Sequence, residues 1–244
     1  VPVAIDAIGI TETAGPISLK MSKADIIKSN MVAVKLDTNV NSAYPERGPI
    51  VSPDGKTLYF SRSFDESNIG GKKDHEDIWY SEWDSKKKAW TKARNIGEPL
   101  NNADPNFINS ISPDGNVLFL GNAYNENGES EDGVSISKRT ATGWGFPQTL
   151  NIDGLDNKNK KANYFLANSM KTIVFSIEQK NDSYGDRDLY VSFIGPDSVW
   201  SKPLNLGKQI NTIGTEEGPF LASDNRTLYF SSDGLGGYGG ADIY

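Results

Sequence analysis

Short apolar runs follow polar turns at regular intervals along this chain, and the pattern predicts β-strands. Segment 52–61 reads Ser-Pro-Asp-Gly-Lys-Thr-Leu-Tyr-Phe-Ser, and related segments begin at residues 112, 167 and 222. When Phe60, Leu120, Phe175 and Phe230 are aligned, successive copies lie 60, 55 and 55 residues apart. A unit that recurs at a nearly fixed length is the sequence signature of a repeat fold.

Each copy predicts a tight turn followed by a buried strand. In Pro53-Asp54-Gly55 the proline fixes one backbone angle, the aspartate offers a side-chain acceptor, and the glycine permits a positive φ. The β-branched and aromatic residues that come next favour a strand buried on both faces.

The remainder of each unit also repeats. A third strand is predicted at 77–81, 134–137, 188–192 and 242–244, and a fourth, headed by tryptophan, at 90–93, 144–147 and 200–203. Four short strands in about 55 residues are typical of a propeller blade. We therefore expect an all-β fold, a β-propeller of four-stranded antiparallel blades, with about four blades in this chain.

The two ends of the chain depart from the pattern. Residues 1–30 do not fit the repeat and are expected to be an N-terminal extension or the tail of a preceding domain, whereas residues 31–244 are expected to form the propeller. Segment 31–36 resembles a fourth strand without a blade of its own. It could complete the last blade and close the ring, which would remove exposed sheet edges. Alternatively, further blades lie beyond Tyr244, which we favour because four blades is the small end of the range.

Composition and charge narrow the range of functions. The 25 basic and 32 acidic residues give a net charge of −7, which argues against nucleic acid and anionic lipid as partners. No apolar run approaches the roughly 20 residues of a membrane span. The chain has no cysteine and a single histidine, His75, so thiolate chemistry and sites that need two histidines are excluded. No cofactor is expected, because the glycine run 234–240 is not followed by a helix that could bind phosphate.

Several motifs resemble a known family. The segments 200–207 (Trp-Ser-Lys-Pro-Leu-Asn-Leu-Gly), 210–212, 216–220 and 236–244 (Gly-Gly-Tyr-Gly-Gly-Ala-Asp-Ile-Tyr) are similar to WD40-like Pro-Asp repeats. Such repeats occur in TolB-like propellers and in cell-envelope proteins of Bacteroidota, often beside an OmpA-type domain. The resemblance covers residues 32–244. It implies a periplasmic or outer-membrane-associated scaffold that binds protein partners, in some cases within secretion or gliding assemblies. The chain shows neither an OmpA-type domain nor a cysteine for a lipid anchor.

Acidic and tyrosine side chains gather just before the predicted third strands. In an antiparallel blade these loops emerge on one face, so they are expected to form a rim that binds a protein partner. The candidate rim residues are Asp74, Asp77, Tyr124, Tyr184, Asp186, Asp188, Tyr238 and Asp242. For the aspartate immediately before each third strand, the favoured interpretation is instead that it accepts hydrogen bonds from the backbone at the strand entry; for the other acids both interpretations stay open. A polyhydroxylated partner such as a glycan, or a weak calcium site, is also conceivable. No segment matches a calcium-binding loop, however, and no metal site is predicted.

The sequence offers no catalytic constellation, and we expect a binding protein that is not an enzyme. His75 lies in a charged loop, where a solvated histidine is more common than a catalytic one. The alternative is a carbohydrate-active propeller that uses two rim carboxylates, since glycosidases need such a pair about 5–10 Å apart. No pair is singled out by the sequence.

Overall fold

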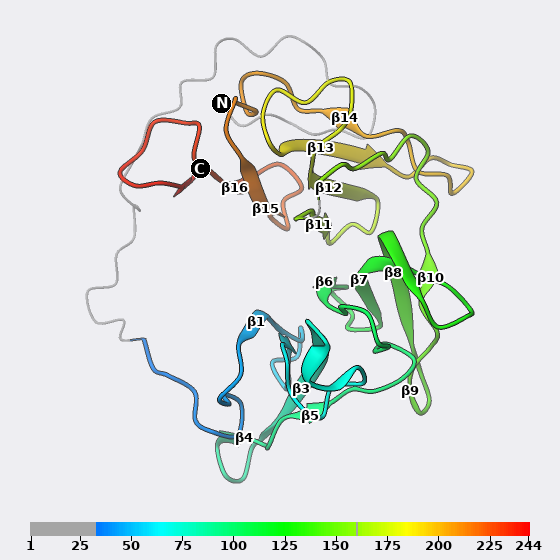
Figure 1. Cartoon of the computed structure of the whole chain (residues 1–244), viewed down its shortest axis with the longest axis vertical. Coiled ribbons are helices and arrows are strands. Elements are labelled where there is room, and N and C mark those ends of the chain that lie inside the picture. The colour runs from blue at the N-terminus through cyan, green and yellow to red at the C-terminus, as the bar shows by residue number, and fades with distance from the viewer. Residues whose placement is uncertain (1–32, 160) are drawn as a thin grey trace. The chain divides into compact units, whose positions relative to one another are not determined.

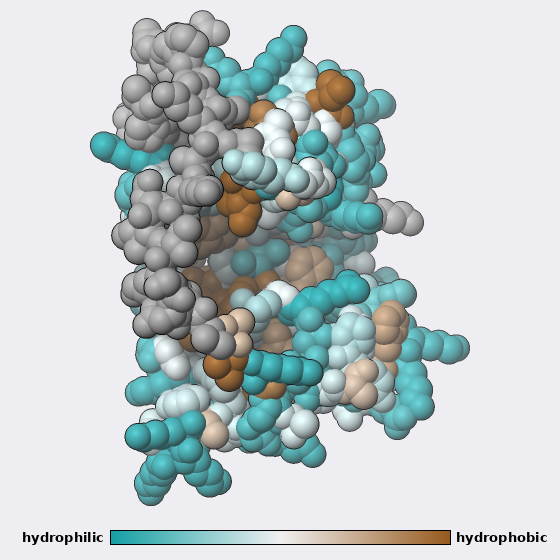
Figure 2. Space-filling model, turned by 90° about the vertical axis from the view of Figure 1, so that its left-hand side faces the viewer, coloured by the Kyte–Doolittle hydropathy of each residue, from teal (hydrophilic) through white to brown (hydrophobic). Residues whose placement is uncertain are grey.

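The computed structural model describes residues 33–159 and 161–244, and the regular secondary structure of this part is almost entirely β-strand. It contains 17 short strands and one 3₁₀ turn, Gly71–Lys73, arranged as four antiparallel sheets (Figure 1). These sheets are the blades of a β-propeller, which confirms the predicted fold class. The predicted extension, residues 1–30, lies outside the described residues. Polar side chains dominate the visible described surface (Figure 2).

The described residues divide into two compact units, each of which holds two sheets. In the unit 33–150, the first sheet follows the order β1-β2-β3-β4, with β5 also paired to β3, and the second follows β6-β7-β8-β10, with β9 also paired to β8. The strands of the first sheet are β1 (Glu46–Val51), β2 (Thr57–Arg62), β3 (Asp77–Asp84), β4 (Ala89–Trp90) and β5 (Arg94–Asn95). Those of the second are β6 (Ile108–Ile111), β7 (Val117–Tyr124), β8 (Ser130–Thr140), β9 (Gly143–Trp144) and β10 (Gln148–Thr149).

The unit 151–244 repeats this arrangement. One sheet has the order β11-β12-β13-β14 and the other has the order β15-β16-β17. The strands are β11 (Asn163–Leu166), β12 (Thr172–Ile177), β13 (Asp188–Phe193), β14 (Leu204–Asn205), β15 (Glu216–Leu221), β16 (Leu228–Ser232) and β17 (Asp242–Ile243). All six residues of β12 are buried, as the apolar run Thr-Ile-Val-Phe-Ser-Ile predicts for a central strand.

The four aligned residues of the repeat occupy equivalent positions in their sheets. Phe60 is paired with Trp79, Leu120 with Ser135 and Phe175 with Tyr190. In the last sheet, the backbone N–H and C=O groups of Phe230 exchange hydrogen bonds with those of Tyr244. The repeat in the sequence therefore corresponds to the same strand pairing in each of the four sheets.

Apolar side chains from neighbouring sheets form a core within each unit. In the unit 33–150, Tyr59 and Ile78 pack with Leu118 and Leu120. In the unit 151–244, Phe165 and Val174 of one sheet pack with Leu221 of the other. Burial of such surfaces is worth about 25 cal/mol per Å² of apolar area and drives the sheets of each unit together.

The outer strands are shorter than the sequence predicts. Of the tryptophan-headed segment 90–93, only Trp90 lies in a strand, β4, and β5 begins after the segment at Arg94. Segment 200–203 likewise precedes its outer strand, β14, which begins at Leu204. Between β4 and β5, the hydroxyl of Thr91 accepts the backbone N–H of Glu82, and the hydroxyl of Ser81 donates to the carbonyl of Thr91. Ser201 accepts the N–H of Phe193 in the same way. At both positions a side-chain hydroxyl takes one bond of the backbone ladder, while the N–H groups of Thr91 and Ser201 still donate to the backbone C=O groups of Glu82 and Phe193.

One other expectation needs correction, the strand predicted at residues 31–36. The described part of the predicted strand 31–36 forms no strand, and its first two residues lie outside the described residues. Among the described residues, no helix is long and apolar enough to cross a membrane.

An asparagine in the linker after the outer strand ties the linker to the third strand. Asn211 accepts the backbone N–H of Leu189 at 2.7 Å and donates to its C=O at 2.9 Å. Asn101 makes the same pair of bonds with Ile78, both at 2.9 Å. Both asparagines are almost fully buried, so the two backbone groups have no access to solvent. This clasp holds each linker against its sheet.

Loss of the clasp is expected to destabilise the unit 151–244. In the variant Asn211→Ala, the N–H and C=O of Leu189 lose their partners inside the protein, which should cost about 2–4 kcal/mol of unfolding free energy. The measurement is chemical denaturation followed by circular dichroism, with the neighbouring exposed Gln209→Ala as the matched control. Equal stability of the two variants would rule out the clasp as a stabilising contact.

Candidate binding surface

Four connecting segments of the unit 151–244 lie side by side, and we call them the loop edge. They are the linker 156–159, the β12–β13 loop 179–187, the linker 212–215 and the β16–β17 loop 233–241. Hydrogen bonds join them in series: Asn159 donates to Asp186 at 2.9 Å, the N–H of Asp186 donates to the C=O of Gly214 at 3.0 Å, and the N–H of Thr215 donates to Asp233 at 2.7 Å. The loop edge is therefore one connected surface.

Glycines allow three of these segments to approach closely. A Cβ atom on Gly185 would lie 2.1 Å from the backbone oxygen of Gly214, and one on Gly214 would lie 2.3 Å from a carboxylate oxygen of Asp233. Both distances are far below van der Waals contact. The β12–β13 loop can therefore reach the linker only because these positions lack side chains.

Two predicted aspartates hold the tips of the loops from below. Asp188 is fully buried and accepts the backbone N–H groups of Tyr184 and Gly185 at 2.8 and 3.2 Å. Asp242 accepts the N–H groups of Tyr238 and Gly239 at 2.7 and 3.1 Å. Asn205 donates to Asp188 from the outer strand at 3.0 Å. Burial raises the pKa of Asp188 above its usual value, although the hydrogen bonds from Tyr184 and Asn205 oppose that change.

The tyrosines at the tips of these loops face solvent. Tyr184 is 42% exposed and Tyr238 is 86% exposed. The ammonium group of Lys208 lies 5.6 Å from the centre of the Tyr184 ring, in cation–π range. The side chain of Asp186 is 60% exposed and is bonded to Asn159. Three predicted residues, Tyr184, Asp186 and Tyr238, thus lie on the loop edge, and two others, Asp188 and Asp242, hold its loops from the strands that follow.

The other three predicted residues lie in the unit 33–150, and all three are buried. Asp77 accepts the N–H of Ile69 at 2.8 Å and the side-chain amide of Asn95 at 2.5 Å. It begins β3 as Asp188 begins β13, and the two aspartates have the same kinds of partner. Asp74 accepts the N–H groups of Gly70 and Glu76 at 3.1 Å each. Both buried carboxylates therefore fix the backbone of the β2–β3 loop by accepting its N–H groups.

Tyr124 ends strand β7 and points into the core of the unit 33–150. Its hydroxyl donates to the C=O of Leu100 at 2.7 Å and accepts from the amide of Asn106 at 3.1 Å. Burial raises the pKa of the phenol well above its usual value. This tyrosine therefore holds the linker that precedes β6 and does not face solvent.

The structure adds Ile213 to the candidate surface, which the sequence reasoning missed. Ile213 is 90% exposed in the linker 212–215, between Thr212 and Gly214. A signal was present in the repeat: in two of the earlier linkers the matching positions hold the small residues Ala43 and Ala103. A large apolar residue at a position where other copies carry alanine favours a role in recognition.

The charged groups of the loop edge do not form a metal centre. Within the part of the chain that the structure describes, no three histidine, aspartate or glutamate side chains are placed to share a metal ion. The carboxylates of Asp188 and Asp242 are occupied by backbone donors. The arrangement is suited to holding loops in one shape and presenting aromatic side chains.

Comparison with known proteins does not assign this chain to a family. No family model and no curated protein matches the sequence. A protein solved as "putative TolB from Agrobacterium tumefaciens" is 20% identical over 84% of this chain and 59% of its own, with a TM-score of 0.48. A mutant of puromycin hydrolase in complex with PGG is 11% identical over 78% of this chain and 34% of its own, with a TM-score of 0.37. The acylaminoacyl peptidase of Pyrococcus horikoshii is 16% identical over 82% of this chain and 30% of its own, with a TM-score of 0.35.

These neighbours overturn one expectation. The chain spans 59% or less of the length of each of the three solved proteins. Two of the three are a hydrolase and a peptidase, so the prediction that this chain is not an enzyme is contradicted. The prediction failed because it rested on the absence of a catalytic motif in the repeat, and propellers also occur within larger enzymes.

Asp77 is expected to make stability depend on pH. Burial raises the pKa of its carboxyl to about 6, and the nearby Asp74 adds to the rise, whereas Asn95 and Ile69 oppose it. Because this pKa is higher in the folded than in the unfolded protein, the folded form binds the proton more tightly between about pH 4 and pH 6. The contribution of Asp77 to the unfolding free energy should therefore fall as pH rises through this window. Melting temperatures of the wild type and Asp77→Asn at pH 4.5 and pH 7 measure the effect.

The wild type should lose more stability than Asp77→Asn on going from the lower to the higher pH. Asp114→Asn is the control, because Asp114 is exposed and hydrogen bonds, chiefly from Ser112, lower its pKa. Parallel pH profiles for the wild type and Asp77→Asn would show that Asp77 is not the titrating group.

The close approach of Gly185 to Gly214 predicts a sharp difference between two glycine substitutions. Gly185→Ala should push the β12–β13 loop away from the linker and break the hydrogen bond from Asp186 N–H to Gly214 C=O. Gly236→Ala should have little effect, because nothing lies within 4 Å of a Cβ at that position. The measurement is amide hydrogen exchange at Asp186. Unchanged protection in Gly185→Ala would contradict the packing described here.

Proposed function

We propose that this chain is a binding propeller whose loop edge recognises a protein partner. The observation that carries the proposal is the combination of exposed tyrosines with a rigid backbone beneath them. Tyr184 and Tyr238 face solvent, while Asp188 and Asp242 hold the backbone N–H groups at the same positions. Tyrosine is enriched among the residues that dominate binding energy at interfaces.

Rigidity of the loops supports recognition on energetic grounds. An interface that is already ordered loses less conformational entropy when the partner binds, so more of the contact energy appears as affinity. The loop edge is ordered by hydrogen bonds between its own segments, including those of Asn159, Asp186 and Thr215. A partner therefore meets a surface of fixed shape.

The exposed side chains indicate what the partner surface should look like. Tyr184, Ile213 and Tyr238 offer apolar area, and Asp186 offers negative charge on a chain whose net charge is −7. The complementary surface is an apolar patch bordered by lysine or arginine. In this proposal Tyr184, Asp186 and Tyr238 contact the partner. Asp74, Asp77, Asp188 and Asp242 hold the loops, and Tyr124 holds a linker.

The wider setting is proposed from the resemblance of the repeat. We infer that residues 31–244 form one propeller, that residues 1–30 precede it as an extension, and that the protein works in the periplasm or at the outer membrane. The segments 200–207 and 236–244 support this inference through their similarity to envelope repeats. A scaffold within an envelope assembly, such as a secretion or gliding complex, is the role that this setting favours.

The proposal is tested by affinity purification with two versions of the loop edge. The wild type and the double variant Tyr184→Ala, Tyr238→Ala are used as baits on the envelope fraction, and bound proteins are identified by mass spectrometry. Loss of two interface tyrosines should weaken binding of a specific partner by a factor of about 10 or more.

The control bait is Val199→Ala. Val199 is exposed in the turn that follows β13, at the end of that strand opposite Asp188. It should recover the same partner as the wild type. If the double variant recovers the partner as well as the control does, the loop edge is not the binding surface.

A further inference from the structure

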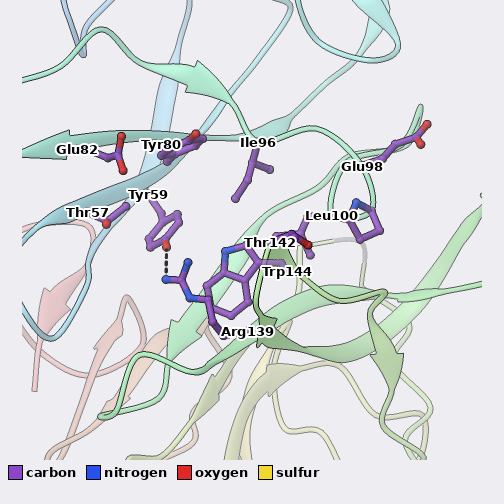
Figure 3. A pocket seen from close by; sticks show the side chains of 12 residues that line it. Thr57, Tyr59, Tyr80, Glu82, Ile96, Glu98, Leu100, Arg139, Thr142 and Trp144 are labelled. Carbon is purple, nitrogen blue, oxygen red and sulfur yellow. Dashed lines mark hydrogen bonds between the residues drawn. The ribbon is translucent and has the colours of Figure 1, made fainter.

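A cleft in the unit 33–150 lies between its two sheets, away from the loops discussed above. Its volume is 420 Å³, within the usual range for small-ligand sites. One wall comes from β2, β3 and the linker that follows β5, and the other from the end of β8 and from β9 (Figure 3). The side chains that matter for its chemistry are Tyr59, Tyr80, Ile96, Leu100, Arg139 and Trp144.

Arg139 is held in place by an aromatic ring and a phenol. Its guanidinium carbon lies 4.3 Å from the centre of the Trp144 ring, in cation–π contact. One terminal nitrogen donates to the hydroxyl of Tyr59 at 3.4 Å, and Figure 3 shows this bond across the cleft. Stacking fixes the plane of the guanidinium and leaves its remaining N–H groups at the edge free to bind another acceptor.

No carboxylate of the described residues forms an ion pair with Arg139. The neighbouring acid Glu82 also lines the cleft, but it is already paired with Arg94. The carboxylate of Glu98 points away from Arg139 in Figure 3. The cleft therefore contains an oriented positive charge without a negative partner among these residues.

Apolar side chains also line part of the cleft, although most of its lining surface is polar. Leu100 and Tyr59 are nearly fully buried and belong to the core of this unit, and Ile96 and Tyr80 pack against that core. A guanidinium group binds a carboxylate through two parallel hydrogen bonds. With aromatic and aliphatic side chains beside it, the guanidinium of Arg139 matches a ligand that has a carboxylate attached to an apolar group. A doubly charged phosphate fits less well, since there is one free guanidinium and Glu82 and Glu98 lie nearby.

We propose that this cleft binds a carboxylate attached to an aromatic or branched apolar group, with Arg139 as the anchor for the carboxylate. Two sources of this chemistry exist: a free small carboxylic acid and the C-terminal residue of a polypeptide. Both place one carboxylate against Arg139 and one apolar side chain against Ile96 and Tyr80.

The test is isothermal titration of the whole chain with N-acetyl-phenylalanine, its carboxamide, and a short peptide that ends in phenylalanine. The acid should bind about tenfold or more tightly than the amide, because only the acid forms the charge-assisted pair. Arg139→Gln should reduce binding of the acid to the level of the amide. Arg139→Lys, which keeps the charge but loses the paired donors, should lie between.

The matched control is Lys138→Gln, which removes one positive charge from the adjacent residue of β8. Successive residues of a strand face opposite sides, so this variant should bind the acid as the wild type does. An equal melting temperature for Arg139→Gln and the wild type shows that folding is preserved. Tighter binding of the peptide than of the small acid identifies a polypeptide terminus as the ligand, and equal binding identifies the small carboxylate.

Three results would overturn the proposal: equal affinity for acid and amide, unchanged affinity in Arg139→Gln, or no heat of binding for the acid at about 10 mM. The cleft and the loop edge share no residues. Failure here therefore leaves the partner-binding proposal intact, and failure of the purification experiment does not affect this one.

Discussion

The entries to strands β3 and β13 each depend on a small network of one aspartate and two asparagines. In the sheet that contains β13, Asp188 binds the loop backbone, Asn205 binds Asp188, and Asn211 binds both Asn205 and the backbone of Leu189. The sheet that contains β3 has a similar network, with Asp77, Asn95 and Asn101 in these positions. It differs in that one carboxylate oxygen of Asp77 has no hydrogen-bond partner among the described residues. The network joins the loop, the outer strand and the linker to the next sheet at one point.

This network explains how the chain combines a regular scaffold with distinctive loops. Buried polar groups are costly unless they are hydrogen-bonded, and here each oxygen of the Asp188 carboxylate receives a donor. The loops that precede these strands can then differ in sequence, because the aspartate at the start of each strand and its asparagine partners fix the ends of the loops. Tyr184 and Tyr238 are exposed on loops of different length and composition, but both are anchored through the aspartate that begins the following strand.

The repeat made the fold predictable, because a copied register places Phe60, Leu120, Phe175 and Phe230 in equivalent positions. The outer strands were less predictable, since the hydroxyls of Thr91 and Ser201 each take one bond of the backbone ladder where tryptophan suggested a continuous strand. Burial was the part of the site that sequence did not reveal. Asp77 and Tyr184 are both polar residues near a strand entry, and only the tertiary contacts show that the first is internal and the second is exposed. Arg139 had no sequence signal at all, because its role depends on a stacking partner and on the empty space beside it.

Hydrogen exchange at the amides of Tyr184 and Gly185 tests most directly whether the buried network orders the exposed loop. In the wild type both amides should be protected, because they donate to Asp188. In Asn205→Ala, which removes the side chain that steadies Asp188, protection at these two amides should fall while that of Phe175 in β12 stays unchanged. Unprotected amides in the wild type, or equal protection in the variant, would contradict the account.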